Sequence, residues 1–430
     1  MALTKIQVAH DITSYDPRSH GAQCDECPLN GNKVVPPQLR PSRLVILGEA
    51  PGEQEEDKGR PFVGPSGYRL DKALRKCGVE RSTVHVTNTV LCRPPGKSFS
   101  PESWKAAIEC CHPRLERELG NKRVILAAGA KAMGATTGKS TVFSWMGSIY
   151  PARIGELNFA VASIHPAYAL RAPAYLPVWQ TFVARAVRLA SGKLKPWDWG
   201  TLVHEEGGPG EATVAALSAL QRASKLSIDI ENRPSDGHIR CIGVGDTALA
   251  VSVLLPPEAP FHSEADRLLR QLLSGPATKV LQNGRHDRRE LRASGYDVTG
   301  PYFDTLLAHA IVAPRLKHDL GFMAALEFPA ERWKSEFKNA NEDKGRKKKL
   351  ARVFEVVGPD KLLPYNCKDV VAQARLEEVF QGRLATTPRG QELFETSTQL
   401  NEVALKMQDA GRSEERRVGK ECRSRWSPYH

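Results

Sequence analysis

The sequence predicts an α/β protein of two domains, in which each β-sheet is covered by helices. Short apolar segments alternate with longer helix-like segments through the first half of the chain, which is typical of a parallel sheet sandwiched between helices. Strand-like segments follow one another closely after residue 225, and they indicate an antiparallel meander; the mixed sheet expected for this domain is implied by a family resemblance given below. A length of 430 residues also exceeds what one ordinary core accommodates.

The first domain is expected over residues 1–194, with strands that are short and rich in branched apolar residues. Such segments suit a parallel sheet that is buried on both faces. Gly48, Pro51 and Gly52 end the first strand in a tight loop, where the backbone can approach a ligand closely. Because α/β proteins bind ligands at the carboxyl ends of parallel strands, we expect a site at this loop. The expected strands are 43–47, 84–91, 124–128 and 159–164, and the expected helices are 66–78 and 101–119.

A stretch over 195–212 is rich in Pro, Gly, Trp and acidic residues and has no apolar period, so we interpret it as a linker. The second domain is expected over 213–395. Its expected elements are a helix at 211–224, strands at 226–231, 242–248 and 251–255, a strand running into a helix within 279–287, a helix opening at 302, and helices containing 365–369 and 396–411.

The composition indicates a protein of a reducing compartment with a polyanionic partner. The net charge is +12, which favours a partner such as DNA. None of the apolar runs reaches membrane-spanning length and no signal-peptide pattern opens the chain, so we expect a cytoplasmic protein without a membrane partner. The nine cysteines are unevenly spaced, which suits a metal or cluster site better than a disulfide framework.

Cysteines in the first domain predict a metal or cluster site. Cys24 and Cys27 form a C-x-x-C pair in a polar, loop-like segment, and Cys92 and the doublet Cys110–Cys111 follow. Four thiolates from one close pair and two distant positions suit either tetrahedral zinc or a cubane iron–sulfur cluster. The spacing alone leaves both open.

Two motifs of the first domain resemble a known family. GEAPG at 48–52, followed by GRPFVG at 59–64, is very similar to the first motif of the iron–sulfur (family 4) uracil-DNA glycosylases. His165-Pro-Ala, after the fourth expected strand, resembles the second motif of that family, and the resemblance covers residues 20 to 190. One departure is Glu55-Glu56, where the family usually carries Asp at the second of these positions.

The resemblance implies a 4Fe–4S cluster that pins the N-terminal loops, and a pocket for an extruded uracil. It implies Cys24, Cys27, Cys92 and Cys111 as cluster ligands, with Cys110 as the alternative to Cys111. In the pocket, the Asn88 amide would read uracil and reject cytosine, whose donor and acceptor are reversed. Around the base, Phe62 would stack on it, Gly48 would let the backbone approach closely, and Glu55 would crowd the methyl group of a thymine. For the reaction, His165 would donate to uracil O2 and Glu49 would activate water. Leu170 would fill the space that the base leaves in the stack, and Arg171 would bind phosphate.

Paired carboxylates in the second domain indicate divalent cations. Asp229 and Glu231 lie two apart on an expected strand, so they share a face, and adjacent carboxylates favour a cation between them. Asn283 and Asp287 follow in an N-x-x-x-D pattern, and Tyr365 and Asp369 share one helical face. These three motifs, in this order, resemble the 3′–5′ proofreading exonuclease domain of family A DNA polymerases over residues 220 to 385.

That second resemblance implies an RNase H-like exonuclease with two Mg²⁺ or Mn²⁺ ions. Asp229, Glu231, Asp287 and Asp369 would hold the ions. Tyr365 would orient the attacking water, and Asn283 would fix the local strand end. The expected substrate is single-stranded DNA or a frayed 3′ end.

The last part of the sequence changes character. Residues 344–352 are basic and predict a solvated face or a phosphate contact, and 396–411 resembles the segment that leads into a polymerase domain. Residues 412–430 resemble a translated sequencing adaptor, so we exclude them from fold reasoning. Their six Arg and Lys against three Glu leave a net charge of +9 for the rest of the chain. We therefore expect a fragment of a phage-like family A polymerase, monomeric and lacking its polymerase domain.

Three functions compete on the sequence alone. The first is a bifunctional DNA enzyme that excises uracil and degrades DNA from its 3′ end. The second is a uracil-sensing domain that binds without excising, attached to an active exonuclease. The third is an iron–sulfur redox or RNA-processing protein with an RNase H-like fold. Glu49, Asn88 and His165 favour the first of these.

Overall fold

The structure is a computed structural model that describes residues 15–120, 123–139, 141–194, 197–233, 237–256, 263–330, 333–335 and 357–409. The chain divides into two compact units, Met1–Trp197 with Phe328–Arg332, and Asp198–Glu327 with Trp333–His430. No helix among the described residues is long and apolar enough to cross a membrane. The basic run 344–352 and the tail 412–430 lie outside the described residues.

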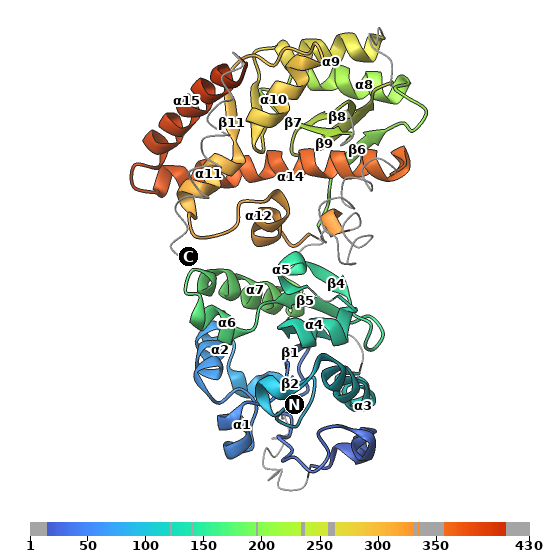
Figure 1. Cartoon of the computed structure of the whole chain (residues 1–430), viewed down its shortest axis with the longest axis vertical. Helices are drawn as coiled ribbons and strands as arrows, with labels where there is room; N and C mark the ends of the chain where they lie inside the picture. The colour runs from blue at the N-terminus through green and yellow to red at the C-terminus, as the bar shows by residue number, and fades with distance from the viewer. Residues whose placement is uncertain are drawn as a thin grey trace, which may run out of the picture. The chain divides into compact units, whose positions relative to one another are not determined.

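The first unit contains a five-stranded sheet with the order β2-β1-β3-β5-β4 (Figure 1). The four strands expected from the sequence are parallel to one another, whereas β4 pairs antiparallel with β5 at the edge. The sequence does not predict β4, because it has three residues and one of them is a proline. The strands are β1 Leu44–Gly48, β2 His85–Asn88, β3 Val124–Ala128, β4 Ile149–Pro151 and β5 Phe159–Ser163.

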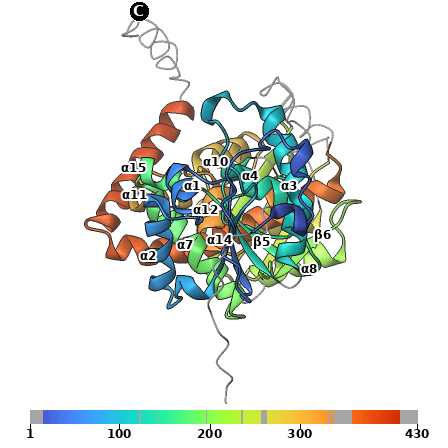
Figure 2. The same cartoon turned by 90° about the horizontal axis from the view of Figure 1, so that it is seen from below.

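Helices cover both faces of this sheet. Val45 and Leu47 of β1 pack in one core cluster with residues of α3 and α4, and α7 contacts the sheet on the opposite side. Figures 1 and 2 both place α3 on one side and α2 with α7 on the other. The helical elements are η1 Pro17–His20, η2 Cys24–Glu26, α1 Glu53–Lys58, α2 Pro65–Lys76, η3 Arg81–Thr83, η4 Gly96–Ser98, α3 Pro101–Leu119, α4 Ala130–Thr137, α5 Val142–Trp145, α6 Pro166–Arg171 and α7 Tyr175–Ala190.

The second unit contains a six-stranded mixed sheet with the order β11-β10-β7-β8-β9-β6. The meander expected from the sequence is present, since β7, β8 and β9 pair antiparallel. The outer strands β11, β10 and β6 pair parallel to their neighbours. The strands are β6 Thr201–His204, β7 Lys225–Asn232, β8 Ile239–Gly245, β9 Leu249–Leu254, β10 Thr278–Leu281 and β11 Tyr302–Asp304. The α/β class, with one mainly parallel and one mixed sheet, is therefore confirmed.

The segment 195–212 is not a linker throughout, because β6 lies within it and pairs with β9. Four residues with no strong alternation give no strand signal in the sequence, and pairing with β9 stabilises them as an edge strand.

One face of the second sheet packs against the 28-residue helix α14, and the other packs against α8 and α9 (Figure 1). A Cβ on Gly243 in β8 would lie 2.3 Å from Asn366 Oδ1 of α14, so a glycine there allows the close approach of helix and sheet. The helical elements are α8 Glu211–Leu220, α9 Glu264–Ser274, α10 Gly284–Ala293, α11 Thr305–Val312, α12 Leu320–Glu327, η5 Trp333–Ser335, α14 Pro359–Thr386 and α15 Gly390–Asp409.

Asp304 joins two elements that the sequence does not predict to meet. The sequence places it in the first turn of a helix, but it ends β11 and caps α11 by accepting from Leu306 N at 2.9 Å. Its carboxylate also accepts from Asn283 N at 3.1 Å and from Gly284 N at 2.9 Å. This buried carboxylate therefore fixes the end of β10 and the start of α10.

His309 gives the second unit an acid-sensitive contact. It is 0% exposed, and its Nδ1 lies 2.7 Å from Nδ1 of His318. Burial and then the neighbouring His318 lower the pKa of His309 to about 4. The unfolded chain, with a pKa near 6.5, therefore binds the proton first as the pH falls. We expect the free energy of unfolding to decrease by as much as ~3 kcal/mol between pH 6.5 and pH 4.

Urea unfolding of the wild-type chain and of His309→Leu at several pH values tests this expectation. Carboxylates also titrate in part of this range, so the informative quantity is the difference between the two proteins. The variant should lose less stability than the wild type on acidification. Equal losses would show that His309 does not contribute.

Candidate functional site

The first candidate site, proposed below to be a base pocket, lies at the carboxyl ends of β1 and β2. Gly48 and Asn88 are register partners at the ends of these strands. A Cβ on Gly48 would lie 2.2 Å from Asn88 Oδ1 and 2.8 Å from Phe62 Cζ. Gly48, Asn88 and Phe62 therefore converge, and only a glycine at position 48 leaves room for the other two.

Asn88 presents an amide that accepts and donates no hydrogen bond among the described residues. The residue is 3% exposed, and among the described residues its side chain has no hydrogen-bond partner. An amide carries both a donor and an acceptor, so it can pair with a base that offers the complementary groups. This amide is therefore available to a ligand that enters beside Phe62.

His165 precedes α6, with its ring beside the Phe62 ring at a centroid distance of 5.9 Å. Its Nδ1 accepts from Ala167 N at 3.2 Å, so the proton of the neutral ring lies on Nε2. Burial lowers the pKa of His165, against the opposite influence of the carboxylates Glu49 and Glu55. The ring is therefore a neutral donor through Nε2.

Glu49 follows β1 and reaches the start of α4. Its Oε1 accepts from Lys131 N at 3.0 Å. A Cβ on Gly129, whose φ is 104°, would lie 2.5 Å from the same oxygen. The glycine before α4 thus makes room for the Glu49 carboxylate.

Glu55 closes the loop that holds Phe62. Its carboxylate accepts from Gly52 N at 3.1 Å, Val63 N at 3.2 Å and Gly64 N at 3.3 Å. The sequence predicts a loop here, but residues 53–58 form the helix α1, which this carboxylate caps. Its oxygens are therefore bound to backbone amides of the loop. The neighbouring Glu56 forms an ion pair with Arg93 at 3.1 Å.

Arg81 is a pocket residue that the sequence analysis missed. Phe62 has a φ of 52°, which is unfavourable for an aromatic residue. Arg81 donates to the carbonyls of Phe62 at 2.8 Å and Pro61 at 2.6 Å, and to Asp71 at 3.1 Å. These bonds stabilise the strained turn, and only the folded structure brings Arg81 to it.

Leu170 and Arg171 lie at the end of α6. Leu170 is half-buried and Arg171 is exposed. The charge of Arg171 is close enough to influence His165. Both residues therefore lie near the rim of the pocket.

The cysteines predicted as cluster ligands lie together. Cys24, Cys27, Cys92, Cys110 and Cys111 line one small cavity beside the buried side chains of Leu29, Val90 and Ala107. Burial, and then the neighbouring Cys111, Cys27 and Cys24, raise the pKa of Cys92 to about 12. Four mutually repelling thiolates in an apolar shell fit a tightly bound metal or cluster.

The second site lies between β7 and α14. Ligand atoms of Asp229, Glu231 and Asp369 all lie within 4.8 Å of one another. Asp229 and Glu231 share the face of β7 that packs against α14, as the strand alternation predicts. Asp287 of α10 is outside this group of three, although Asp229 is the nearby charge that influences it most.

The carboxylates of this site are unfavourable without a cation. Burial and then the charge of Asp369 raise the pKa of Asp229 to about 7. Burial and neighbouring carboxylates also raise the pKa values of Glu231 and Asp287 well above their usual range. Clustered oxygen ligands of this kind fit Mg²⁺ or Mn²⁺.

Two amides of α14 hold Asp229 in place. Asn366 Nδ2 donates to Asp229 Oδ2 and Gln373 Nε2 donates to Oδ1, both at 2.8 Å. Asn366 Oδ1 accepts in turn from Ser252 Oγ at 2.7 Å. The sequence analysis missed both amides, although they share a helical face with Asp369 and this stripe was visible in the sequence.

Lys334 is a further residue of the second site that the sequence analysis missed. Its Nζ donates to Asp369 Oδ2 at 2.6 Å and to Tyr365 Oη at 3.2 Å. Trp333 Nε1 donates to the other oxygen, Asp369 Oδ1, at 2.5 Å. Tyr365 and Asp369 lie one turn apart on α14, as expected, and Asn283 precedes α10 with a φ of 60°.

Comparison with known proteins divides the chain in the same way. Residues 36–184 match the model of the uracil DNA glycosylase superfamily, and residues 211–385 match the model of a 3′–5′ exonuclease. The type-4 uracil-DNA glycosylase of Pyrobaculum aerophilum is 37% identical over 162 residues, which cover 35% of this chain and 81% of the relative. The chain belongs to the type-4 uracil-DNA glycosylase family.

A second relative agrees with this assignment. The type-4 uracil-DNA glycosylase of Thermotoga maritima is 34% identical over 162 residues, covering 35% of this chain and 79% of the relative. Among solved structures, Brucella melitensis NrnC with bound Mg²⁺ matches 44% of this chain and 82% of its own, at 18% identity and a TM-score of 0.30. Both resemblances inferred from the sequence are confirmed by the family models.

The cysteine doublet of this type-4 glycosylase unit allows a direct test of ligand choice. Cys111 is among the cysteines whose charge influences both Cys24 and Cys92, whereas Cys110 is buried. We expect Cys111→Ser to lose most of the visible absorbance and iron content of an iron–sulfur protein, and Cys110→Ser to keep them. Iron analysis and visible spectra of the two purified variants measure this. The opposite result would make Cys110 the ligand.

Proposed function

We propose that this chain performs two hydrolytic reactions on DNA. The first unit cleaves the N-glycosidic bond of uracil, and the second removes nucleotides from 3′ ends with the help of divalent cations. The proposal rests above all on the Asn88 amide, which lies beside Gly48 as the Phe62 ring does and has no hydrogen-bond partner among the described residues. The family membership and the exonuclease match support the two activities independently.

Uracil fits the polar groups of the first pocket. The Asn88 amide can accept from N3–H and donate to O4 of uracil, and the Phe62 ring can stack on the base. Cytosine presents the opposite polarity at those two atoms, so it leaves the amide and the base unpaired. A base bound in this way is recognised by its edge, in agreement with the selectivity that the sequence predicts.

Bond cleavage requires stabilisation of the leaving base and of the sugar. His165 Nε2–H can donate to uracil O2, where negative charge develops as the glycosidic bond breaks. Its lowered pKa keeps it a neutral donor at physiological pH. Glu49, anchored by Lys131 N, offers its carboxylate to orient the attacking water and to stabilise the cationic sugar.

We propose that Cys24, Cys27, Cys92 and Cys111 hold a 4Fe–4S cluster that stabilises the loops around this pocket. The four thiols line one cavity in an apolar shell, and the type-4 glycosylase family supports iron–sulfur over zinc.

In the second unit, Asp229, Glu231, Asp287 and Asp369 are proposed to hold two Mg²⁺ or Mn²⁺ ions. When bound, such ions activate water and stabilise the leaving 3′ oxygen. The Tyr365 hydroxyl, held by Lys334, can orient the attacking water. Asn366 and Gln373 keep both oxygens of Asp229 in place, and Asn283 is proposed to fix the end of β10.

A single labelled DNA strand tests both activities. The strand carries one uracil and a label at its 5′ end. Incubation in EDTA followed by alkali should cleave it at the uracil, and incubation with Mg²⁺ should shorten it from the 3′ end. Binding of the strand without alkali-labile cleavage would instead make the first unit a uracil-sensing module. No shortening with Mg²⁺ or Mn²⁺ would contradict the nuclease assignment.

A further inference from the structure

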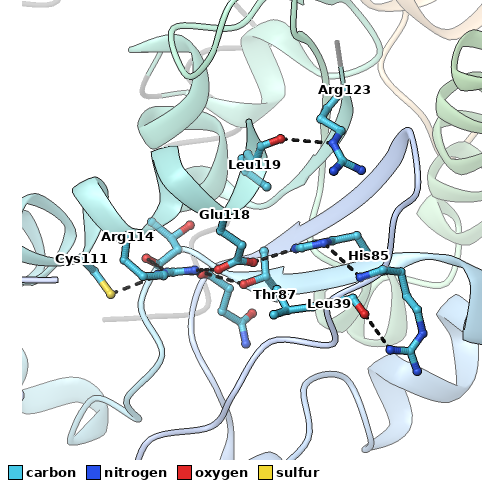
Figure 3. Close-up of polar contacts among 11 residues, drawn as sticks. Leu39, His85, Thr87, Cys111, Arg114, Glu118, Leu119 and Arg123 are labelled. Carbon is cyan, nitrogen blue, oxygen red and sulfur yellow. Dashed lines mark hydrogen bonds and ion pairs between the residues drawn. The ribbon is translucent and has the colours of Figure 1, made fainter. Parts of the chain in front are cut away.

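Arg114 connects the cysteine site with the uracil pocket. It is fully buried in α3, and one of its terminal nitrogens, Nη2, reaches three acceptors (Figure 3). Nη2 donates to the carbonyl of Asn88 at 2.9 Å and the carbonyl of Thr89 at 3.0 Å, and it lies 3.6 Å from Cys111 Sγ. A single guanidinium group therefore contacts a proposed cluster ligand and the backbone of the residue proposed to read uracil.

The other side of the guanidinium is held by a second buried acid. Arg114 Nη1 donates to Glu118 Oε2 at 2.5 Å and to Thr87 Oγ1 at 3.2 Å (Figure 3). Glu118 Oε1 accepts in turn from His85 Nε2 at 2.7 Å, because His85 Nδ1 accepts from Arg40 N. Arg114 Nε has no partner among the described residues, so its two terminal nitrogens set its orientation.

We propose that Arg114 is a positioning residue that couples the cluster held by the four cysteines to base recognition by Asn88. This inference rests on the proposed function, since it takes Cys111 as a cluster ligand and Asn88 as the group that reads uracil. The sulfur and the two carbonyls compete for the same Nη2 group. Added negative charge on the sulfur strengthens the hydrogen bond from Nη2 to the sulfur and weakens the hydrogen bonds from Nη2 to the two carbonyls.

The coupling acts in both directions. If an external electron donor reduced the cluster, more negative charge would lie on the Cys111 sulfur, and Arg114 would transmit this change to the backbone of Asn88. By linkage, uracil bound to Asn88 must change the reduction potential of the cluster by the corresponding amount. Hydrogen bonds to cluster sulfurs are a known determinant of these potentials. A guanidinium that only satisfied buried carbonyls would produce no such base-specific effect.

The wild-type protein provides the first test. The reduction potential of the cluster is measured by spectroelectrochemical titration with two otherwise identical single strands. One strand contains a single 2′-fluoro-2′-deoxyuridine, which resists cleavage, and the other contains deoxycytidine at that position. Binding of either strand changes the electrostatic environment of the cluster, so the expected result is a difference between the two shifts. Equal shifts would overturn the proposal.

The second test compares Arg114→Lys with Arg123→Lys. Lysine keeps the charge but cannot contact three acceptors and Glu118 at once. Arg123 is a matched control because its Nε donates to the carbonyl of Leu119 and it contacts neither Cys111 nor Asn88 (Figure 3). In Arg114→Lys we expect a more negative reduction potential and loss of the base-specific shift. We also expect kcat to fall about tenfold, because the Asn88 amide is displaced. KM should be nearly unchanged, since Arg114 has no access to the DNA.

The outcomes separate this inference from the proposed function. A loaded Arg114→Lys protein with the wild-type potential and base-specific shift would overturn the coupling. If this variant does not fold, the wild-type comparison of the two strands decides alone. A wild-type protein that shows the base-specific shift but excises no uracil would contradict the proposed glycosylase activity and leave the coupling in place.

Discussion

Replacing Asp229 with asparagine is expected to lower the rate of 3′-end degradation by ~10³-fold or more and to leave uracil excision unchanged. Asp229 lies beside Glu231 and Asp369 in the second site, and the carboxylate oxygens of the three residues lie within 4.8 Å of one another. The substitution removes one negative charge from this set. It also disturbs the geometry, because Asn366 and Gln373 each donate to one Asp229 oxygen and an amide can accept at only one of the two positions.

The rate of shortening of a 3′ end in Mg²⁺, measured with excess enzyme, tests this expectation. Asp297→Asn is the matched control, since Asp297 is an exposed acid of the same unit. The control should retain wild-type rates in both assays. If Asp229→Asn kept a tenth or more of the nuclease rate, Asp229 would not belong to the site at which the reaction occurs. Loss of uracil excision in the same variant would show that the units are not independent.

Much of this fold is predictable because its signals are local. Buried parallel strands such as β1 and β3 appear in the sequence as short apolar runs, and the two-residue spacing of Asp229 and Glu231 fixes their common face. Asn88 falls within the expected strand 84–91, and the structure ends this strand at Asn88. Local periodicity therefore places the residues proposed to contact a substrate on the correct strands.

The residues that support them cannot be predicted locally. Arg81 is in the loop before β2 but stabilises the turn at Phe62, and Lys334 reaches Asp369 on α14. Their contacts exist only after the chain has folded, and a single Arg or Lys in a basic sequence gives no signal of its own. The short edge strands β4 and β6 were missed for a related reason, because pairing with a neighbouring strand rather than their own sequence stabilises them.

Replacing Asn88 with alanine is expected to lower the rate of uracil excision by ~10³-fold, because N3–H and O4 of the bound base would both lose their partner. The same substitution should lower the free energy of unfolding only slightly. Among the described residues the Asn88 side chain has no hydrogen bond to lose, and the backbone bond from Arg114 does not involve it. Large loss of activity with little loss of stability is the behaviour expected of a group held ready for a ligand.

Asn32→Ala provides the contrasting control. Asn32 Nδ2 donates to the carbonyl of Arg93 at 2.9 Å, in an exposed part of the same unit. Its removal should lower the free energy of unfolding by about 1 kcal/mol and leave excision at the wild-type rate. Single-turnover excision of uracil and urea unfolding, measured on both variants, separate the two effects. If Asn88→Ala loses stability and activity together, the amide is part of the scaffold, and the base must be read by another group in the pocket.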